Sequence, residues 1–165
     1  MSGEADDPPA SAPTAGGTPG TTPLFVDTGA FYARLDESDA HHQRAQAIFD
    51  AIKSGDLPYR PLYTNRYVLA ELATLTLGRV GHAAAVGTLE RIRESPTFNV
   101  EPVGEATFTS TCEQFAQYDD QEISFFDHIT GVMARERDVE HVFTFDPDDF
   151  RTLGFTVVPA DTGEP

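Results

Sequence analysis

Short apolar runs of strand length alternate with longer amphipathic segments from residue 24 to residue 158, and this alternation is the feature that most restricts the fold. Brief apolar runs bounded by turn residues are typical of buried strands. The longer segments repeat apolar residues every three or four positions, as helices with one buried face do. Strands separated by helices pair in parallel through crossover connections. The sequence therefore predicts an α/β, three-layer sandwich with a small, mostly parallel sheet of about five strands.

The same pattern places the individual elements. Strands are predicted at residues 24–26, 62–64, 98–103, 141–145 and 155–158, and helices at 28–35, 40–53, 66–77, 81–94, 105–118 and 125–137. Asp39 and Ser124 each precede a helix that they are expected to cap, and Gly55 follows the end of the helix after Asp39. Cys112, the single cysteine, is expected in the core because it falls on an apolar helix face. His128 is expected on the surface of its helix.

One domain between two tails is expected from the length of 165 residues. Residues 1–23 consist almost entirely of Pro, Gly, Ser, Thr and Ala, a composition typical of a flexible tail. The folded domain is predicted at residues 24–159, and residues 160–165 are interpreted as a second, short tail. No apolar run is long enough for a membrane span and no signal segment opens the chain, so a cytoplasmic protein without a membrane partner is expected.

Acidic residues greatly outnumber basic ones, with 27 Asp and Glu against 11 Lys and Arg and a net charge of -16. Proteins that coat DNA or RNA carry a basic stripe, and none is visible here. Scattered arginines that could meet phosphate are Arg34, Arg60, Arg66, Arg79 and Arg151. An acidic surface with Lys53 as its single lysine resembles proteins of salt-loving archaea, so most of the acids are expected to reflect a halophilic environment.

Four acidic residues occupy positions where parallel α/β folds bind ligands, beyond the carboxyl ends of strands. Asp27 ends the first predicted strand and Asp146 the fourth, whereas Glu71 and Asp127 lie early in helices. Two carboxylates about 4 Å apart repel by roughly 1 to 4 kcal/mol at effective dielectric constants between water and a protein surface. A hard divalent cation, Mg²⁺ or Mn²⁺, would offset that repulsion, activate water and hold a phosphodiester.

Each acid also has a local explanation when it is taken alone. Asp127 fits a Ser-x-x-Asp capping box after Ser124. Glu71 fits a solvated helix edge, and Asp146 fits an ordinary turn. Asp27 is harder to explain in this way, because it directly ends a buried strand. The interpretation as a site therefore depends on the four residues together.

Four motifs contain these acids in a characteristic order: Leu24-Phe-Val-Asp27-Thr28, Thr64-Asn-Arg-Tyr-Val-Leu-Ala-Glu71, Ile123-Ser-Phe-Phe-Asp127 and Thr144-Phe-Asp146-Pro-Asp-Asp149-Phe150. This order resembles the PIN-domain nucleases, especially the VapC-type ribonuclease toxins, over residues 24–158. Toxins of this kind usually begin close to the first strand, unlike this chain.

The resemblance implies a PIN-like parallel sheet with helices on both sides and Mg²⁺- or Mn²⁺-dependent endonucleolytic cleavage of RNA. It implies that Asp27, Glu71, Asp127 and Asp146 are the catalytic and metal-binding residues. Accessory roles are implied for Asp149 and for three threonines that could hold water or a carboxylate: Thr28, Thr64 and Thr144. The resemblance further implies a homodimer and a cognate antitoxin.

Several other functions are weighed against this one. Asp27-Thr28-Gly29 and Asp161-Thr-Gly163 match the aspartic-protease signature, but those enzymes need two such loops on an all-β framework. A receiver domain needs a lysine after its last strand, and a calcium loop needs glycine where Arg151 stands. Two alternatives remain open: an RNA-processing PIN nuclease outside a toxin system, and a non-catalytic PIN-like binding or scaffold module.

Overall fold

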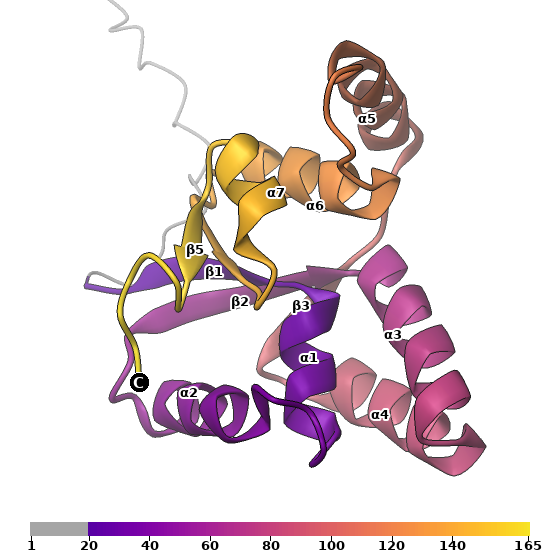
Figure 1. Cartoon of the computed structure of the whole chain (residues 1–165). Coiled ribbons are helices and arrows are strands. Elements are labelled where there is room, and N and C mark those ends of the chain that lie inside the picture. Colours follow the sequence, from indigo (N-terminus) through magenta and orange to yellow (C-terminus); the bar gives the residue numbers. More distant parts are fainter. Residues whose placement is uncertain (1–19) are drawn as a thin grey trace, which may run out of the picture.

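The computed structural model describes residues 20–165 and contains an all-parallel, five-stranded sheet with helices on both faces (Figure 1). The strands are β1 (Thr22–Val26), β2 (Tyr59–Asn65), β3 (Phe98–Glu101), β4 (His141–Phe143) and β5 (Thr156–Val158). The helices are α1 (Thr28–Leu35), α2 (His42–Ser54), α3 (Arg66–Arg79), α4 (His82–Glu94), α5 (Glu105–Gln117), α6 (Phe125–Glu136) and α7 (Pro147–Thr152). The predicted fold class is confirmed.

Two hydrophobic clusters lie on opposite faces of the sheet. Side chains alternate between the faces along a strand, so Leu24 and Val26 pack with α1 to α4, whereas Phe25 packs with α6 and α7. These three side chains are fully buried. The apolar run of the central strand is therefore continuous, as both-sided burial requires.

The strand order β3-β2-β1-β4-β5 places the switch in strand order between β1 and β4. The chain builds outward from β1 through β2 to β3 and then returns to the other side of β1. In open parallel sheets, ligands bind in the crevice beyond the carboxyl ends of the strands at such a switch. Asp27 follows β1 there, and its backbone N–H donates to the carbonyl of Phe143 in β4 at 3.1 Å.

One helix was not expected. Residues after Asp146 form α7, a single short helix with Pro147 in its first turn and Phe150 buried beneath it. Proline is favoured at this position because the first helical N–H has no intrahelical partner. Asp146 thus precedes a helix instead of an ordinary turn.

The predicted start of α2 was wrong by two residues. The helix begins at His42, and the carboxylate of Asp39 accepts a hydrogen bond from the backbone N–H of His41, which precedes the helix. Asp39 therefore stabilises the loop before α2 and is not its cap. Gly55 ends α2 in the left-handed conformation (φ 88°), as predicted.

Two predictions of burial were also wrong, and both concern the packing of α5 on α6. Cys112 is exposed, because α5 buries only Thr111 and leaves Phe108 and Phe115 half exposed. His128 is buried instead of exposed, because the ring of Phe115 covers it.

The structure describes the C-terminal end of the chain but not its first 19 residues. Most of the flexible tail predicted for residues 1–23 lies outside the described residues, and β1 already begins at Thr22. At the other end, the carboxylate of Glu164 accepts a hydrogen bond from the Tyr59 hydroxyl at 2.6 Å, and its carbonyl accepts from Arg44. Between residues 20 and 165, no helix is long and apolar enough to cross a membrane.

The contribution of the central core to stability can be measured at Phe143. It is fully buried and packs against the rings of Phe49 and Phe145. Phe143→Ala is expected to lower the free energy of unfolding by about 3–5 kcal/mol. Phe126→Ala, at a ring that is 40% exposed, should lower it by less than about 1 kcal/mol. Urea denaturation measures both values, and similar losses would contradict this description of the core.

Candidate functional site

A pocket of about 460 Å³ lies beyond the carboxyl ends of β1 and β4 and is strongly acidic. Its acidic lining residues are Asp27, Asp39, Glu71, Glu122, Asp127, Asp146 and Asp149. No lysine or arginine of the described chain lines it. The structure therefore brings together the four predicted site residues and the accessory Asp149.

Two hydroxyl groups organise the carboxylates around the first strand. Thr28 donates a hydrogen bond from Oγ1 to Oε2 of Glu71 at 3.1 Å, which joins the start of α1 to α3. Thr144 donates from Oγ1 to Oδ2 of Asp27 at 3.3 Å and accepts from the backbone N–H of Asp146 at 3.2 Å. Thr144 thus links the acids that follow β1 and β4.

Thr64 has a different role from the one that the resemblance implied. Its buried hydroxyl donates to the carbonyl of Val26 at 3.0 Å. It does not line the acidic pocket. Thr64 therefore fastens β2 to the end of β1 and holds no carboxylate.

Asn65 positions α3 and was missed in the sequence. It is fully buried, and its Oδ1 accepts from the backbone N–H of Val68 at 2.8 Å. Its Nδ2 donates to Oγ1 of Thr130 in α6 at 3.3 Å. One residue thus caps the helix that carries Glu71 and fixes it to the helix that carries Asp127. The available signal was an asparagine directly before a predicted helix, a favoured cap.

Asp127 lies in the first turn of α6, where Ser124 caps the helix as predicted by accepting from the Asp127 backbone N–H at 3.1 Å. Burial, the charge of Asp27 and a hydrogen bond to Asp149 raise the pKa of the Asp127 carboxyl to about 8. At neutral pH this carboxyl therefore holds a proton in the metal-free protein.

The pKa of Asp27 is raised to about 6, chiefly by burial, with the charges of Glu71 and Asp146 adding to the effect. Hydrogen bonds from the backbone of Thr28 and the side chain of Thr144 act in the opposite direction. Several of these carboxylates thus destabilise one another's charged forms.

His41 and Asp39 line the pocket from the loop before α2, and neither was predicted as a site residue. The ring of His41 stacks on that of Phe145, with centroids 4.5 Å apart and an interplanar angle of 4°. This contact joins residues that are far apart in the sequence, which periodicity does not report. It forms one wall of the acidic pocket.

A family model described as the PIN domain matches residues 24–155. The chain belongs to the PIN-domain family. The resemblance stated from its four motifs is therefore confirmed, and the acidic pocket of this PIN domain contains the acidic residue of every motif.

A known endonuclease resembles the chain over most of its length. The 23S rRNA-specific endonuclease VapC20 of Mycobacterium tuberculosis is 31% identical over 137 residues, which are 82% of this chain and 97% of the relative. The crystal structure of VapC20, described as a sarcin-ricin loop cleaving toxin, matches with a TM-score of 0.72 and 30% identity over 81% of this chain and 96% of that one.

Two more distant structures share the fold. FitAcB from Neisseria gonorrhoeae has a TM-score of 0.59 and 20% identity over 81% of this chain and 95% of that one. VapBC2 from Rickettsia felis, bound to a DNA fragment from their promoter, has a TM-score of 0.59 and 10% identity over 82% of this chain and 97% of that one. At these identities the likeness concerns the fold alone.

The PIN pocket has the chemistry of a site for a hard cation. Carboxylate oxygens are the ligands that Mg²⁺ prefers, and they dominate the lining. Among residues 20–165, however, no three Asp, Glu, His or Cys side chains are arranged so that they could hold a metal ion as they lie. The metal-binding role of Asp27, Glu71, Asp127 and Asp146 stays a prediction.

The raised pKa values predict how stability depends on pH without metal. The pKa values of Asp27 (about 6) and Asp127 (about 8) exceed the ordinary value of 3.8, so between about pH 4 and pH 8 the folded protein holds more protons than the unfolded one. Stability therefore falls as pH rises across this range. Asp127→Asn, which imitates the protonated carboxyl, is expected to flatten the fall and to stabilise the protein at pH 8 by about 1 kcal/mol or more.

Urea denaturation in EDTA at pH 5 and pH 8 measures this effect. Asp120→Asn removes an exposed carboxylate outside the pocket and is the matched control. It should retain the pH dependence of the unmodified protein. Equal pH dependence in all three proteins would contradict the assignment of raised pKa values to the pocket.

Proposed function

We propose that this protein is a metal-dependent endoribonuclease that hydrolyses RNA phosphodiester bonds as the toxin of a toxin–antitoxin pair. The observation that carries the proposal is the joint position of Asp27, Glu71, Asp127 and Asp146 in one pocket at the strand-order switch. The likeness to the 23S rRNA-specific endonuclease VapC20, at 31% identity over 82% of this chain, supports the substrate class. Membership of the PIN-domain family supports the reaction.

We assign the four carboxylates to a site for Mg²⁺ or Mn²⁺. A bound divalent cation supplies a Lewis acid for the scissile phosphate and lowers the pKa of a water molecule. Thr28 orients the Glu71 carboxylate, and Thr144 orients that of Asp27. Asp149 shares a hydrogen bond with Asp127 and would hold that carboxyl in place.

RNA binding at this pocket depends on the same cation. The pocket carries many carboxylates and, within residues 20–165, no lysine or arginine, so it repels a phosphodiester in the absence of metal. The predicted arginines lie elsewhere: Arg151 pairs with Asp161 at 2.5 Å, Arg34 covers the ring of Phe49, and Arg79 covers that of Tyr32. Coordination of the phosphate therefore replaces a basic surface in this proposal.

An antitoxin partner fits the acidity of the pocket. The likeness to VapC20, whose crystal structure is described as that of a toxin, supports such a partner. A segment that carries an arginine would form charge-assisted hydrogen bonds with the carboxylates and would exclude both metal and RNA. We also propose a homodimer, which the family resemblance implies, and a location in the cytoplasm.

Two alternatives keep a PIN fold with another role. An RNA-processing nuclease outside a toxin system would cleave RNA but would have no small open reading frame upstream of its gene. A binding or scaffold module would neither bind metal nor cleave RNA. The full set of acids favours the enzyme, because unneutralised carboxylates raise one another's pKa and serve no purpose in a scaffold.

Asp27→Asn tests the reaction directly. In Mn²⁺, the purified protein should cleave RNA, and the variant should be slower by about 100-fold or more, since loss of several kcal/mol of charge stabilisation corresponds to that factor. Asp120→Asn should retain full activity. Gel analysis of a labelled RNA at low and at high salt measures the rates. Equal rates for Asp27→Asn and the unmodified protein would disprove the site, and no cleavage by either, with no metal binding by calorimetry, would favour the scaffold.

Thr144→Val tests the residue that links Asp27 and Asp146. The valine keeps the shape but removes the hydrogen bond to Asp27 and the acceptor for the Asp146 N–H. Loss of such an orienting group is expected to lower metal affinity or cleavage by about 10- to 100-fold. Thr74→Val, at an exposed threonine on α3, is the control. Calorimetry with Mn²⁺ separates the two effects, and unchanged affinity and rate would show that Thr144 does not position the acids.

A further inference from the structure

One wall of the acidic pocket is a pair of flat rings with a free face. His41 and Phe145 both line the pocket, and their rings stack in parallel, with centroids 4.5 Å apart and an interplanar angle of 4°. His41 is exposed, whereas Phe145 is half-buried. Among residues 20–165, Phe145 is the only ring that stacks on the imidazole. One face of His41 is therefore covered, and the other is open to the solvent of the pocket.

The core of the protein holds this pair of rings in place. Phe145 meets the fully buried ring of Phe143 edge to face, with centroids 5.6 Å apart. The backbone N–H of His41 donates to Oδ1 of Asp39 at 2.8 Å, and its carbonyl accepts from the N–H of Ala45 at 2.9 Å. The imidazole thus has a fixed backbone and a fixed neighbour, so a planar ligand would stack on it with little loss of side-chain freedom.

The ring of His41 contributes little to the fold beyond covering Phe145. His41 precedes α2, but its side chain makes no capping hydrogen bond to the helix. No residue between 20 and 165 forms a hydrogen bond or an ion pair with this ring. Its polar edge and its open face are therefore both available to a ligand.

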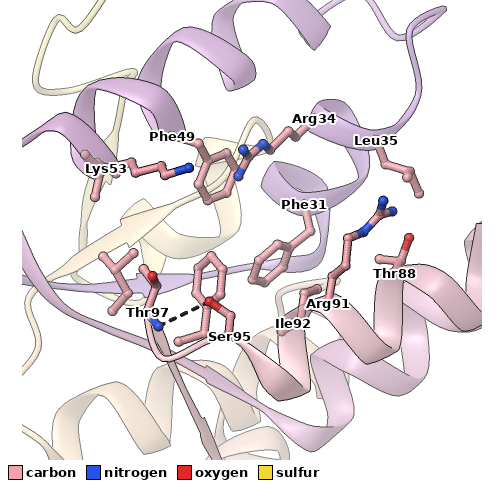
Figure 2. A pocket seen from close by; sticks show the side chains of 13 residues that line it. Phe31, Arg34, Leu35, Phe49, Lys53, Thr88, Arg91, Ile92, Ser95 and Thr97 are labelled. Carbon is pink, nitrogen blue, oxygen red and sulfur yellow. Dashed lines mark hydrogen bonds between the residues drawn. The ribbon is translucent and has the colours of Figure 1, made fainter.

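A ring that lines a hollow is not always accessible, as the groove among α1, α2 and α4 shows (Figure 2). Phe31 and Phe49 stack on each other there with centroids 5.9 Å apart, and the guanidinium of Arg34 lies over Phe49 at 4.9 Å. The two rings are only 6% and 4% exposed. They are part of the core and have no face for a planar ligand, unlike the exposed ring of His41.

The acidity of the pocket restricts which interaction can hold RNA at this wall. No lysine or arginine of residues 20–165 lines the pocket, so RNA phosphates gain nothing there from the release of counterions. Stacking of a base needs no positive charge, and histidine is among the side chains on which unpaired RNA bases stack. The volume of about 460 Å³ is typical of hollows that hold a whole small molecule, so a nucleotide fits beside the carboxylates.

We propose that the free face of His41 stacks on the base of a nucleotide next to the scissile phosphodiester, so that this base extends the stack of Phe145 and His41. The inference rests on the proposed function, because it takes the phosphodiester to lie at the carboxylates of Asp27 and Asp146, which line the same pocket. A base inside a duplex has both faces covered by its neighbours and cannot meet His41. The substrate class that follows is RNA with an unpaired and unstacked nucleotide at the cut site.

Cleavage kinetics on a short RNA test His41 as a stacking residue. His41→Ala should raise KM about fivefold or more with little change in kcat, because a stack formed equally with the bound substrate and with the transition state affects binding alone. His41→Phe keeps a flat ring without its nitrogen atoms and should recover most of this loss. His82→Ala removes an exposed histidine outside the pocket and is the matched control. Equal losses in His41→Phe and His41→Ala would show that the nitrogen atoms matter and would overturn the proposal.

RNAs that lack the base on either side of the cut identify the partner of the ring. With one of these abasic RNAs, the unmodified protein should show the loss that His41→Ala shows on the intact RNA. His41→Ala should lose nothing further on that abasic RNA, because the contact is already absent. Losses that multiply would mean that His41 and the base act independently, and they would contradict the stack.

A titration with adenosine tests the open face of His41 without cleavage and without metal. The nucleoside carries no charge, so the acidic pocket does not repel it in EDTA. In proton NMR spectra, the ring current of a stacked base should move the Cε1–H signal of His41 upfield, and the signal of His82 should stay in place. His41→Phe lacks the first of these signals and so assigns it.

The titration keeps a failure of this inference distinct from a failure of the proposed function. If the unmodified protein cleaves no RNA, the proposed function fails, and the adenosine titration alone decides whether His41 stacks on a base. No shift of the His41 signal at millimolar adenosine, or equal shifts at His41 and His82, would overturn the stacking site whether or not RNA is cleaved.

Discussion

Repulsion among carboxylates that the sheet topology brings together is the constraint on which the site depends. Asp27 follows the central strand, and Asp127 reaches the same pocket from α6. Burial and mutual charge raise both of their pKa values, to about 6 and about 8. The hydroxyls of Thr28 and Thr144 donate hydrogen bonds to Glu71 and Asp27 and hold these carboxylates in place, although the negative charges repel one another. The metal-free pocket therefore holds protons in the place where we propose a cation.

The hydrophobic framework makes this arrangement tolerable. Phe25 and Phe143 lie in the two clusters on opposite faces of the sheet and are fully buried, so the strands that end at the pocket are fixed from both sides. Asn65 then ties α3 to α6 through Val68 and Thr130. The acids cannot move apart without disrupting these contacts, and protonation is the response that remains.

Sequence reasoning predicted what depends on local pattern and missed what depends on distant neighbours. The strands and the position of Asp27 follow from apolar periodicity and from the residue types at strand ends. The short helix α7 was missed because Pro147 after an aspartate is equally typical of a turn. Periodicity identifies an apolar face but not what covers it. Cys112 was therefore wrongly placed in the core, and His128, which Phe115 covers, was wrongly placed on the surface.

The positions of the acidic and basic side chains say more about what the protein can bind than its net charge of -16 does. Where arginines meet acids they form pairs, as Arg137 does with Glu101 at 2.5 Å, and such pairs contribute little net field. The acidic pocket remains unbalanced, because no lysine or arginine of residues 20–165 lines it. An unbalanced pocket attracts the ion that neutralises it, so this one favours a cation. On the proposed function, a divalent cation held by Asp27, Glu71, Asp127 and Asp146 would offset part of their charge, so cleavage would depend on metal despite the acidity of the surface.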